Sequence, residues 1–223
     1  EGDDPIFDEE TTVHVGTDEF HGGEENGNEL FRTFADEMIR YVQANGRKVR
    51  MWASLSDKSG ETPVASDGVQ FNIWSKDYGR PEDMYRLGYD IINTADQWLY
   101  MVPNGTGSRG QYGDYLNVEG MYTSWKPNTM YENTNAAYTI PAGDDQMLGA
   151  CFAIWHDNID AYANGITQYD SFFRFMDTSA VFAEKLWNGD ATAPYAEFSE
   201  TAANMGTAPG TKISAETDAA SNT

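Results

Sequence analysis

Two adjacent acidic residues, Asp18 and Glu19, end a short β-like run in the stretch TTVHVGTDEF, residues 11–20. Positioned carboxyl groups can act as general acids and bases, so an adjacent pair raises the question of catalysis. Acids outnumber bases by 36 to 14 in this chain, and in so acidic a sequence most such pairs only face water. Whether this pair does chemistry therefore depends on the elements that position it.

Those elements are predicted by the periodicity of the apolar residues. Short runs rich in β-branched and aromatic residues alternate with longer runs of helical period. The expected strands are residues 12–15, 48–53, 69–75, 97–103 and 147–158, and the expected helices are residues 28–46, 80–95, 113–125 and 169–187. This alternation is typical of a parallel α/β sheet or barrel. Residues 191–223 are rich in Ala, Thr and Ser and predict a linker or mobile tail, which leaves residues 1–190 as the folded domain.

Each expected strand carries an acid or a large aromatic residue at its C-terminal end. In parallel α/β barrels, that end of the strands holds the active site. Any one of these residues is explained as well by core packing or by surface polarity, but their occurrence at five consecutive strand ends favours a functional rim. In chain order they are Asp18 and Glu19, Trp52, Trp74, Tyr100, and Trp155 with His156 and Asp157.

Composition narrows the class of ligand. Aromatic residues make up 13% of the chain, including 6 Trp and 13 Tyr, and sugar faces stack on such rings, although Trp-rich cores look similar. The net charge of −22 argues against nucleic acid and anionic membranes as partners, and it suits a secreted or surface protein. A single cysteine, Cys151, excludes an internal disulfide and a cysteine-based zinc cluster. No apolar run reaches the length that crosses a membrane.

At this point the sequence resembles a known family. VHVGTDEF, residues 13–20, is similar to the His-x-Gly-x-Asp-Glu signature that ends the fourth barrel strand of glycoside hydrolase family 20, the β-N-acetylhexosaminidases. Trp52 and Trp74 fall where that family places pocket tryptophans after its fifth and sixth strands. Tyr100, in WLYMVP, matches its seventh-strand tyrosine, and WHD, residues 155–157, resembles its eighth-strand Trp-x-acid element. The resemblance covers roughly residues 5–188.

The chain also departs from the family pattern. Many members have an acid two residues after the seventh-strand tyrosine, where this chain has Val102, and many have Glu in place of Asp157. Either difference affects contacts to outer hydroxyls of the sugar. The match begins at the fourth strand, so the first three strands, and the arginine that the family uses there to hold the terminal sugar, are not among these residues.

The resemblance implies a substrate-assisted, retaining hydrolysis of terminal β-linked N-acetylglucosamine, or N-acetylgalactosamine, through an oxazolinium ion. It assigns the general acid–base role to Glu19 and the orientation of the substrate's 2-acetamido N–H to Asp18. Tyr100 would donate its hydroxyl to the acetamido oxygen. Because neighbouring side chains of a strand point to opposite faces, the acidic pair must lie just past the strand.

The remaining family positions are expected to bind the sugar rather than to react. Trp52, Trp74 and Trp155 would wall the pocket, Asp157 would bind an outer hydroxyl, and His14 would brace the acidic pair. The resemblance implies no cofactor and no metal. His21, Glu24 and Glu25 form a superficial ligand set, but no second histidine lies at helical spacing from His21.

The Gly-rich segment NGTGSRGQYGDY, residues 104–115, lacks the Lys-Ser/Thr pair of a phosphate-binding loop. It predicts a mobile active-site loop that carries Tyr112 over the sugar.

Five strands do not close an eight-stranded barrel, so we expect the C-terminal part of a TIM (β/α)₈ barrel, about strands 4–8. The partner that this requires is the N-terminal half of the same barrel, and the chain begins at EGDDPIF without a Met, as after processing. Similarity of YMVPNGTG and YGDYLN to large Gram-positive cell-surface enzymes implies an extracellular protein, secreted or attached to the cell wall. Two alternatives remain: a lacto-N-biosidase of the same family, and a catalytically silent glycan-binding module.

Overall fold

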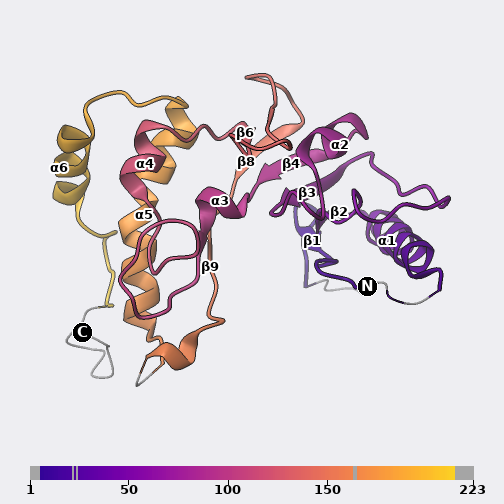
Figure 1. Ribbon diagram of the computed structural model, residues 1–223, viewed down its shortest axis with the longest axis horizontal. Coiled ribbons are helices and arrows are strands. Elements are labelled where there is room, and N and C mark those ends of the chain that lie inside the picture. Colours follow the sequence, from indigo (N-terminus) through magenta and orange to yellow (C-terminus); the bar gives the residue numbers. More distant parts are fainter. Residues whose placement is uncertain (1–5, 22, 24, 163–164, 214–223) are drawn as a thin grey trace. The chain divides into compact units, whose positions relative to one another are not determined.

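The structure is a computed structural model that describes residues 6–21, 23, 25–162 and 165–213. It divides into two compact units (Figure 1). The first unit holds residues 1–95 and 128–149, and the second holds residues 96–127 and 150–223. The predictions that concern residues 1–5, Glu24 and residues 214–223 lie outside the described residues.

A five-stranded sheet forms the centre of the first unit, with the strand order β1-β2-β3-β4-β8. Strands β1 to β4 pair in parallel, and their register places His14 beside Arg50, Arg50 beside Gln70, and Gln70 beside Asp90. The bounds are β1 Thr12–His14, β2 Lys48–Trp52, β3 Val69–Ile73, β4 Asp90–Asn93 and β8 Met147–Ala150. The predicted α/β class with a parallel sheet is therefore confirmed, whereas a partial barrel stays a prediction.

The two faces of this sheet differ in chemistry because successive side chains of a strand point to opposite sides. The apolar face packs against α1, Gly27–Ala44, which lies beside β1 and β2 in Figure 1. The core there comprises Phe31, Ala35, Ile39, Val49, Met51, Val69, Phe71 and Ile73. On the other face, the guanidinium of Arg50 donates two hydrogen bonds, 2.9 and 2.7 Å long, to Oε1 of Gln70. The apolar face thus packs against α1 and stabilises the sheet. The polar face carries His14, Arg50 and Gln70, which lie side by side in register.

The expected helix over residues 80–95 is wrong in its second half. Helix α2, Pro81–Arg86, starts with proline at its first position and is followed by Gly88 at φ 87°, a conformation that ends the helix. The chain then enters β4, where Ile91 and Ile92 are buried. The apolar run YDII fits a buried strand as well as a helix, and β-branched isoleucines favour the strand. A small antiparallel hairpin, β6 Thr129–Met130 and β7 Tyr138–Thr139, completes the unit.

The second unit is helical, with one small sheet. Strands β5, Tyr100–Met101, and β9, Ala153–Ile154, pair in parallel. The helices are α3 Asp96–Leu99, α4 Val118–Thr123, α5 Gln168–Asn188 and α6 Tyr195–Met205, with a 3₁₀ turn at Ile159–Ala161. The expected strand over 97–103 is thus a helical turn followed by two strand residues. The expected strand over 147–158 is two short strands, β8 and β9, and the helix over 113–125 is shorter than expected.

Helix α5 confirms the predicted closing helix, and its ends explain why it is stable. Thr167 and Asp170 form a reciprocal capping box at its start, and Gly189 at φ 75° ends it. Beyond it, residues 195–205 form α6, so this part of the expected linker or tail is helical. Phe198 of α6 stacks on Tyr122 of α4 with ring centroids 4.5 Å apart. The alanine-rich composition is compatible with a helix once one face finds such a partner.

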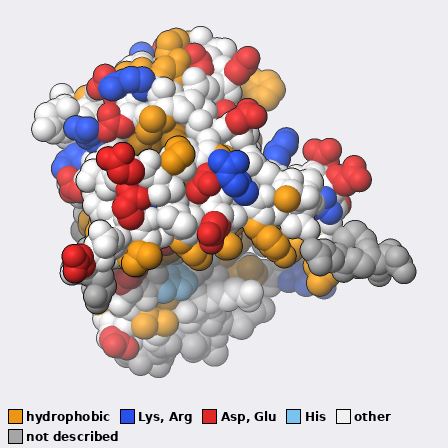
Figure 2. Space-filling model, turned by 90° about the vertical axis from the view of Figure 1, so that its right-hand side faces the viewer, with side chains coloured by type: hydrophobic (Ala, Val, Ile, Leu, Met, Phe, Trp, Pro, Cys, Tyr) orange, Lys and Arg blue, Asp and Glu red, His pale blue; other side chains and the backbone are white. Residues whose placement is uncertain are grey.

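Charged side chains are distributed over the surface. Figure 2 shows one face, on which acidic and basic side chains are interspersed with hydrophobic ones. Among the described residues, no helix combines the length and the apolar character that a membrane crossing needs.

Candidate active site

The loop after β1 carries the acidic pair. The hydrogen-bond ladder continues past His14, because the amide of Val15 donates to the Arg50 carbonyl and the amide of Trp52 donates to the Gly16 carbonyl, both at 2.9 Å. Asp18 and Glu19 follow this ladder and are both exposed. They therefore lie just past the strand, as the alternation of side chains requires.

Three of the four residues 16–19 in this loop have a positive φ. Gly16 has φ 77°, Thr17 has φ 84° and Glu19 has φ 49°. A positive φ is a genuine outlier for a β-branched residue such as Thr17, and such conformations persist only where neighbouring contacts impose them. The Thr17 hydroxyl lies within hydrogen-bond reach of the carbonyl oxygens of Gly16 and Trp52, the latter at 3.2 Å. The end of β2 thus helps to fix the direction of the acidic pair.

His14 and Trp52 lie together on the polar face of the sheet. Their ring centroids are 5.3 Å apart with the planes at 57°, and Nδ1 of His14 accepts a hydrogen bond of 3.0 Å from the amide of Gly16. Desolvation and then the charge of Arg50 lower the pKa of His14, against a hydrogen bond to Asn72 and the charge of Asp18. His14 therefore supports the start of the loop through Gly16.

Trp74 follows β3 and stacks on Tyr78, with centroids 4.9 Å apart and planes at 21°. The buried indole Nε1 of Trp74 has no hydrogen-bond partner among the described residues. Burial raises the pKa of Tyr78, and the nearby negative charge of Glu19 raises it further. Tyr78 therefore belongs to the surroundings of the acidic pair, although its place in the sequence does not indicate this.

In the second unit, Tyr100 lies on β5 and is 8% exposed. Its ring meets the edge of Trp155 with centroids 5.5 Å apart at 66°, and the ring of Tyr112 lies 6.0 Å away on a different segment. The amide of Trp155 donates to the Met101 carbonyl at 2.9 Å and so prolongs the pairing of β5 with β9. Tyr100 and Trp155 are thus brought together as the sequence predicts.

Asp157 is exposed two residues beyond Trp155. Between them, Nε2 of His156 lies 3.3 Å from the hydroxyl of Ser171 on α5. The eight predicted site residues therefore form two groups, one in each unit. The first unit holds His14, Asp18, Glu19, Trp52 and Trp74, and the second unit holds Tyr100, Trp155 and Asp157.

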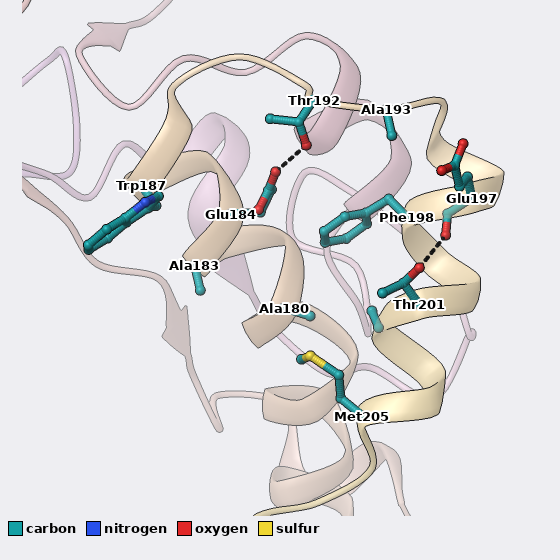
Figure 3. Close-up of a pocket in the computed structure, with 11 residues that line it drawn as sticks. Ala180, Ala183, Glu184, Trp187, Thr192, Ala193, Glu197, Phe198, Thr201 and Met205 are labelled. Carbon is teal, nitrogen blue, oxygen red and sulfur yellow. Dashed lines mark hydrogen bonds between the residues drawn. The ribbon is translucent and has the colours of Figure 1, made fainter.

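Clusters of metal-ligating side chains and surface grooves are two other places where a ligand could bind. Among the described residues, no group of three or more His, Cys, Asp or Glu side chains has the arrangement of a metal site. A groove of about 550 Å³ lies between α5 and α6, and Phe198 of α6 points toward α5 there (Figure 3). Its one carboxylate with a side-chain partner, Glu184, accepts from the Thr192 hydroxyl. None of the predicted site residues lines this groove.

The chain is similar to several proteins of one family. Over 153 residues it is 23% identical to a lacto-N-biosidase from Bifidobacterium bifidum, which covers 68% of this chain and 13% of that protein. A β-N-acetylhexosaminidase from Bacteroides fragilis superposes with a TM-score of 0.60 at 19% identity, over 86% of this chain and 39% of the other. A catalytic module of the pneumococcal exo-β-D-N-acetylglucosaminidase StrH superposes with a TM-score of 0.56 at 18% identity, over 91% of this chain and 48% of the other.

These likenesses extend over a limited part of each relative, since the chain spans less than half of the length of all three. Residues 5–190 match the catalytic domain of glycosyl hydrolase family 20. That match includes the loop after β1, both tryptophan positions of the first unit, and the paired strands β5 and β9 of the second. Because it covers well over half of the chain, the chain belongs to glycosyl hydrolase family 20.

Proposed function

We propose that the protein containing this chain is an exo-acting β-N-acetylhexosaminidase that removes terminal β-linked N-acetylglucosamine, or N-acetylgalactosamine, from glycans. The observation that carries the proposal is the Asp18–Glu19 pair, held just past β1 in a family 20 chain by hydrogen bonds to the end of β2. The C-terminal ends of parallel strands are where this kind of fold places its chemistry.

The proposed reaction uses the substrate as its own nucleophile. The carbonyl oxygen of the 2-acetamido group attacks the anomeric carbon while Glu19 protonates the departing glycosidic oxygen, which gives an oxazolinium ion. Glu19 then takes a proton from water, which attacks the anomeric carbon and reopens the ring with retained configuration. Asp18 stays ionised, accepts a hydrogen bond from the acetamido N–H, and stabilises the positive charge that develops there.

Tyr100 would donate its hydroxyl to the acetamido oxygen, and Trp52, Trp74 and Trp155 would wall the sugar. Asp157 would bind an outer hydroxyl. For Glu19 to begin protonated, its surroundings must be drier than the exposed loop of this chain alone, because an apolar environment disfavours the carboxylate. Substrate and further barrel strands would supply that environment.

We also propose that those strands come from an N-terminal half of the barrel. In the strand order of the sheet, β1 and β8 are the outer strands, and an exposed strand edge is a place where further strands can pair. The solved relatives are more than twice as long as the part that this chain matches. Glycans as substrates fit an extracellular enzyme, secreted or attached to the cell wall, and the net charge of −22 disfavours nucleic acid.

The nucleophile provides the sharpest test. The full-length enzyme is assayed on an aryl β-N-acetylglucosaminide, on its N-trifluoroacetyl analogue and on the β-glucoside. Fluorine withdraws electrons from the acetamido oxygen, so we expect kcat to fall steeply with the analogue and no turnover of the glucoside. Equal rates on all three substrates would exclude participation of the substrate. Binding of the glycan without turnover would instead identify a silent binding module.

A second candidate is a lacto-N-biosidase, and the 23% identity to such an enzyme favours keeping it. That activity releases a disaccharide, which needs a deeper pocket. Incubation with lacto-N-tetraose and with a trisaccharide that ends in N-acetylglucosamine distinguishes the two by the size of the product. Release of the monosaccharide alone supports the hexosaminidase.

A further inference from the structure

The loop over residues 102–116 follows β5 and takes no part in the proposed mechanism. Its glycine-rich sequence predicts a mobile loop. The structure instead shows it tied to the second unit by a buried carboxylate, with Tyr112 beside Tyr100. The inference below rests on the proposed function, because it concerns how Tyr100 is held.

The loop is wrapped around Asp114, which is 1% exposed. Its carboxylate accepts hydrogen bonds from the amides of Asn104 at 2.6 Å, Gly105 at 3.0 Å and Gly107. The Tyr162 hydroxyl donates to the same carboxylate at 2.6 Å. Burial alone would raise the pKa of Asp114, but the Tyr162 hydroxyl and these amides outweigh it and hold the pKa below its ordinary value. The first half of the loop is thereby fixed at the backbone.

The second half of the loop is fixed to α5 by two arginines. Arg174, 3% exposed, donates to the Asp114 carbonyl at 3.0 Å and to the Tyr162 hydroxyl at 2.9 Å. Arg109 forms a two-pronged ion pair with Asp177 at 2.7 and 2.9 Å. Both guanidinium groups lie 4.9 Å from the ring centre of Tyr115, within the range of cation–π attraction. The hydrogen bonds argue against the mobility that composition predicts.

Tyr112 sits between these anchors in an unusual conformation. Its φ is 66°, a strained conformation for a bulky side chain, which persists only where its surroundings impose it. The flanking turn supplies part of that constraint, because the amide of Gly113 donates to the Gly110 carbonyl at 2.9 Å. The phenol supplies the rest, because it donates a hydrogen bond to the carboxylate of Asp96 on α3. Burial and this bond raise the pKa of Tyr112.

Tyr100 needs such support because its strand is short. Strand β5 has two residues and pairs only with β9 among the described residues, so the backbone does little to fix the direction of the phenol. Two rings contact the phenol: Trp155 meets it edge-on at 5.5 Å, and Tyr112 lies tilted at 6.0 Å. Trp155 is aligned by the strand pairing itself, whereas Tyr112 depends on the loop anchors and on Asp96.

We propose that Tyr112 is a positioning residue for Tyr100. With its ring fixed by Asp96 and by the loop wound around Asp114, Tyr112 sets the plane of the Tyr100 phenol and so the direction in which the hydroxyl meets the acetamido oxygen. Misplacement of a reacting group by about 1 Å can cost up to about 10²-fold in rate. A tyrosine outside the reaction is therefore expected to change kcat through Tyr100 alone.

The test is a double-mutant cycle in the full-length enzyme with an aryl β-N-acetylglucosaminide. We expect Tyr112→Ala to lower kcat about tenfold with KM within about twofold, and Tyr112→Phe, which keeps the ring, to lower it about threefold. In the Tyr100→Phe background, Tyr112→Ala is expected to change kcat by less than about twofold, because the group that it positions is gone. Asp96→Asn, which keeps an acceptor for the phenol, is expected to retain most of the activity.

The controls separate this role from stability and from the proposed function. Tyr41→Phe alters an exposed tyrosine of α1 and is expected to leave kcat unchanged. Thermal unfolding of each variant shows whether the fold is intact. Equal losses from Tyr112→Ala in both backgrounds would overturn the positioning role while Tyr100 keeps its own. No effect of Tyr100→Phe in an active enzyme would overturn the assignment of Tyr100 and the positioning role together.

Discussion

In the first unit, Asp18 and Glu19 are exposed on a loop that backbone hydrogen bonds hold to β2. In the second unit, Tyr100 is 8% exposed between two aromatic rings, next to a loop wound around a buried carboxylate. The difference follows the strands. Where strands β1 to β4 pair in parallel, backbone hydrogen bonds place the loop that carries the acidic pair. Where the strands have two residues, buried charges and rings take over that task.

The site residues of the two units are therefore expected to respond differently to substitution. Side chains held by the backbone can be exchanged with little effect on the fold, so their variants report on chemistry. Side chains that belong to a buried network report on stability first, because a partner left unpaired in the interior is costly. The following predictions test that division, beginning with the largest expected effect.

The largest effect is expected at the acidic pair. Asp18→Asn and Glu19→Gln each remove a group that the proposed reaction needs, so kcat on an aryl β-N-acetylglucosaminide is expected to fall by roughly 10²-fold or more. Because both side chains are exposed, urea unfolding of the variants is expected to match the parent. Glu10→Gln, at another exposed acid, serves as the control. Near-parental turnover in either variant would remove the mechanism.

The next effect concerns the buried network of the second unit. Arg174→Ala leaves the Tyr162 hydroxyl and the Asp114 carboxylate without a buried cation, and such losses cost about 3–5 kcal/mol. Arg40→Ala is the matched control in the first unit, because it breaks an ion pair with Asp36 in which the arginine side chain is 63% exposed. We expect a clear fall in the urea midpoint for Arg174→Ala and none for Arg40→Ala. Equal shifts would contradict the proposed division between the units.

The sequence predicted the backbone-held group better than the network-held group. The sequence predicts the loop after β1 because a strand period of two leaves no room for two adjacent inward acids, so the pair must follow the strand. Helix α1 and helix α5 were found because their apolar residues recur over many turns. Such features depend on local pattern, and local pattern is what a single sequence contains.

The features that were missed depend on contacts between distant segments. The sequence predicts helix at β4 because four residues are too few to show a period, and burial by neighbouring strands decides its form. The composition of residues 191–223 predicts a tail, whereas packing of Phe198 on Tyr122, a contact between distant segments, helps to stabilise α6. No sequence pattern marks Tyr78, since its contact with Trp74 and its proximity to the charge of Glu19 depend on the path of a loop. The network around Asp114 likewise joins residues far apart in sequence.

A smaller effect is expected from Thr17, the strained residue beside the acidic pair. Thr17→Gly relieves the strain of a positive φ, but it also removes the hydrogen bond from the hydroxyl to the Trp52 carbonyl. The two changes in the free energy of unfolding should therefore cancel to within about 1 kcal/mol. The loop would lose its fixed direction, and we expect kcat to fall about fivefold. Thr17→Ser keeps the hydroxyl and is expected to retain more activity than Thr17→Gly. Parental kcat in Thr17→Gly would show that the strain does not serve the site.

The smallest effect concerns pH. Desolvation and Arg50 lower the pKa of His14 in the folded chain, so the unfolded chain binds the proton more tightly. Stability from this group is therefore complete above the ordinary pKa of about 6.5 and falls as pH drops below it. Because His14 is exposed, we expect the slope to be shallow. His14→Gln should flatten the pH dependence of the unfolding free energy between about pH 7 and 5.

The carboxylate of Asp114, whose pKa is also lowered, should lose its contribution to stability only below about pH 4. Asp114→Asn should therefore leave unchanged the pH dependence of stability that His14 causes between about pH 7 and 5. A flattened slope near neutrality in Asp114→Asn would mean that the two units do not titrate separately.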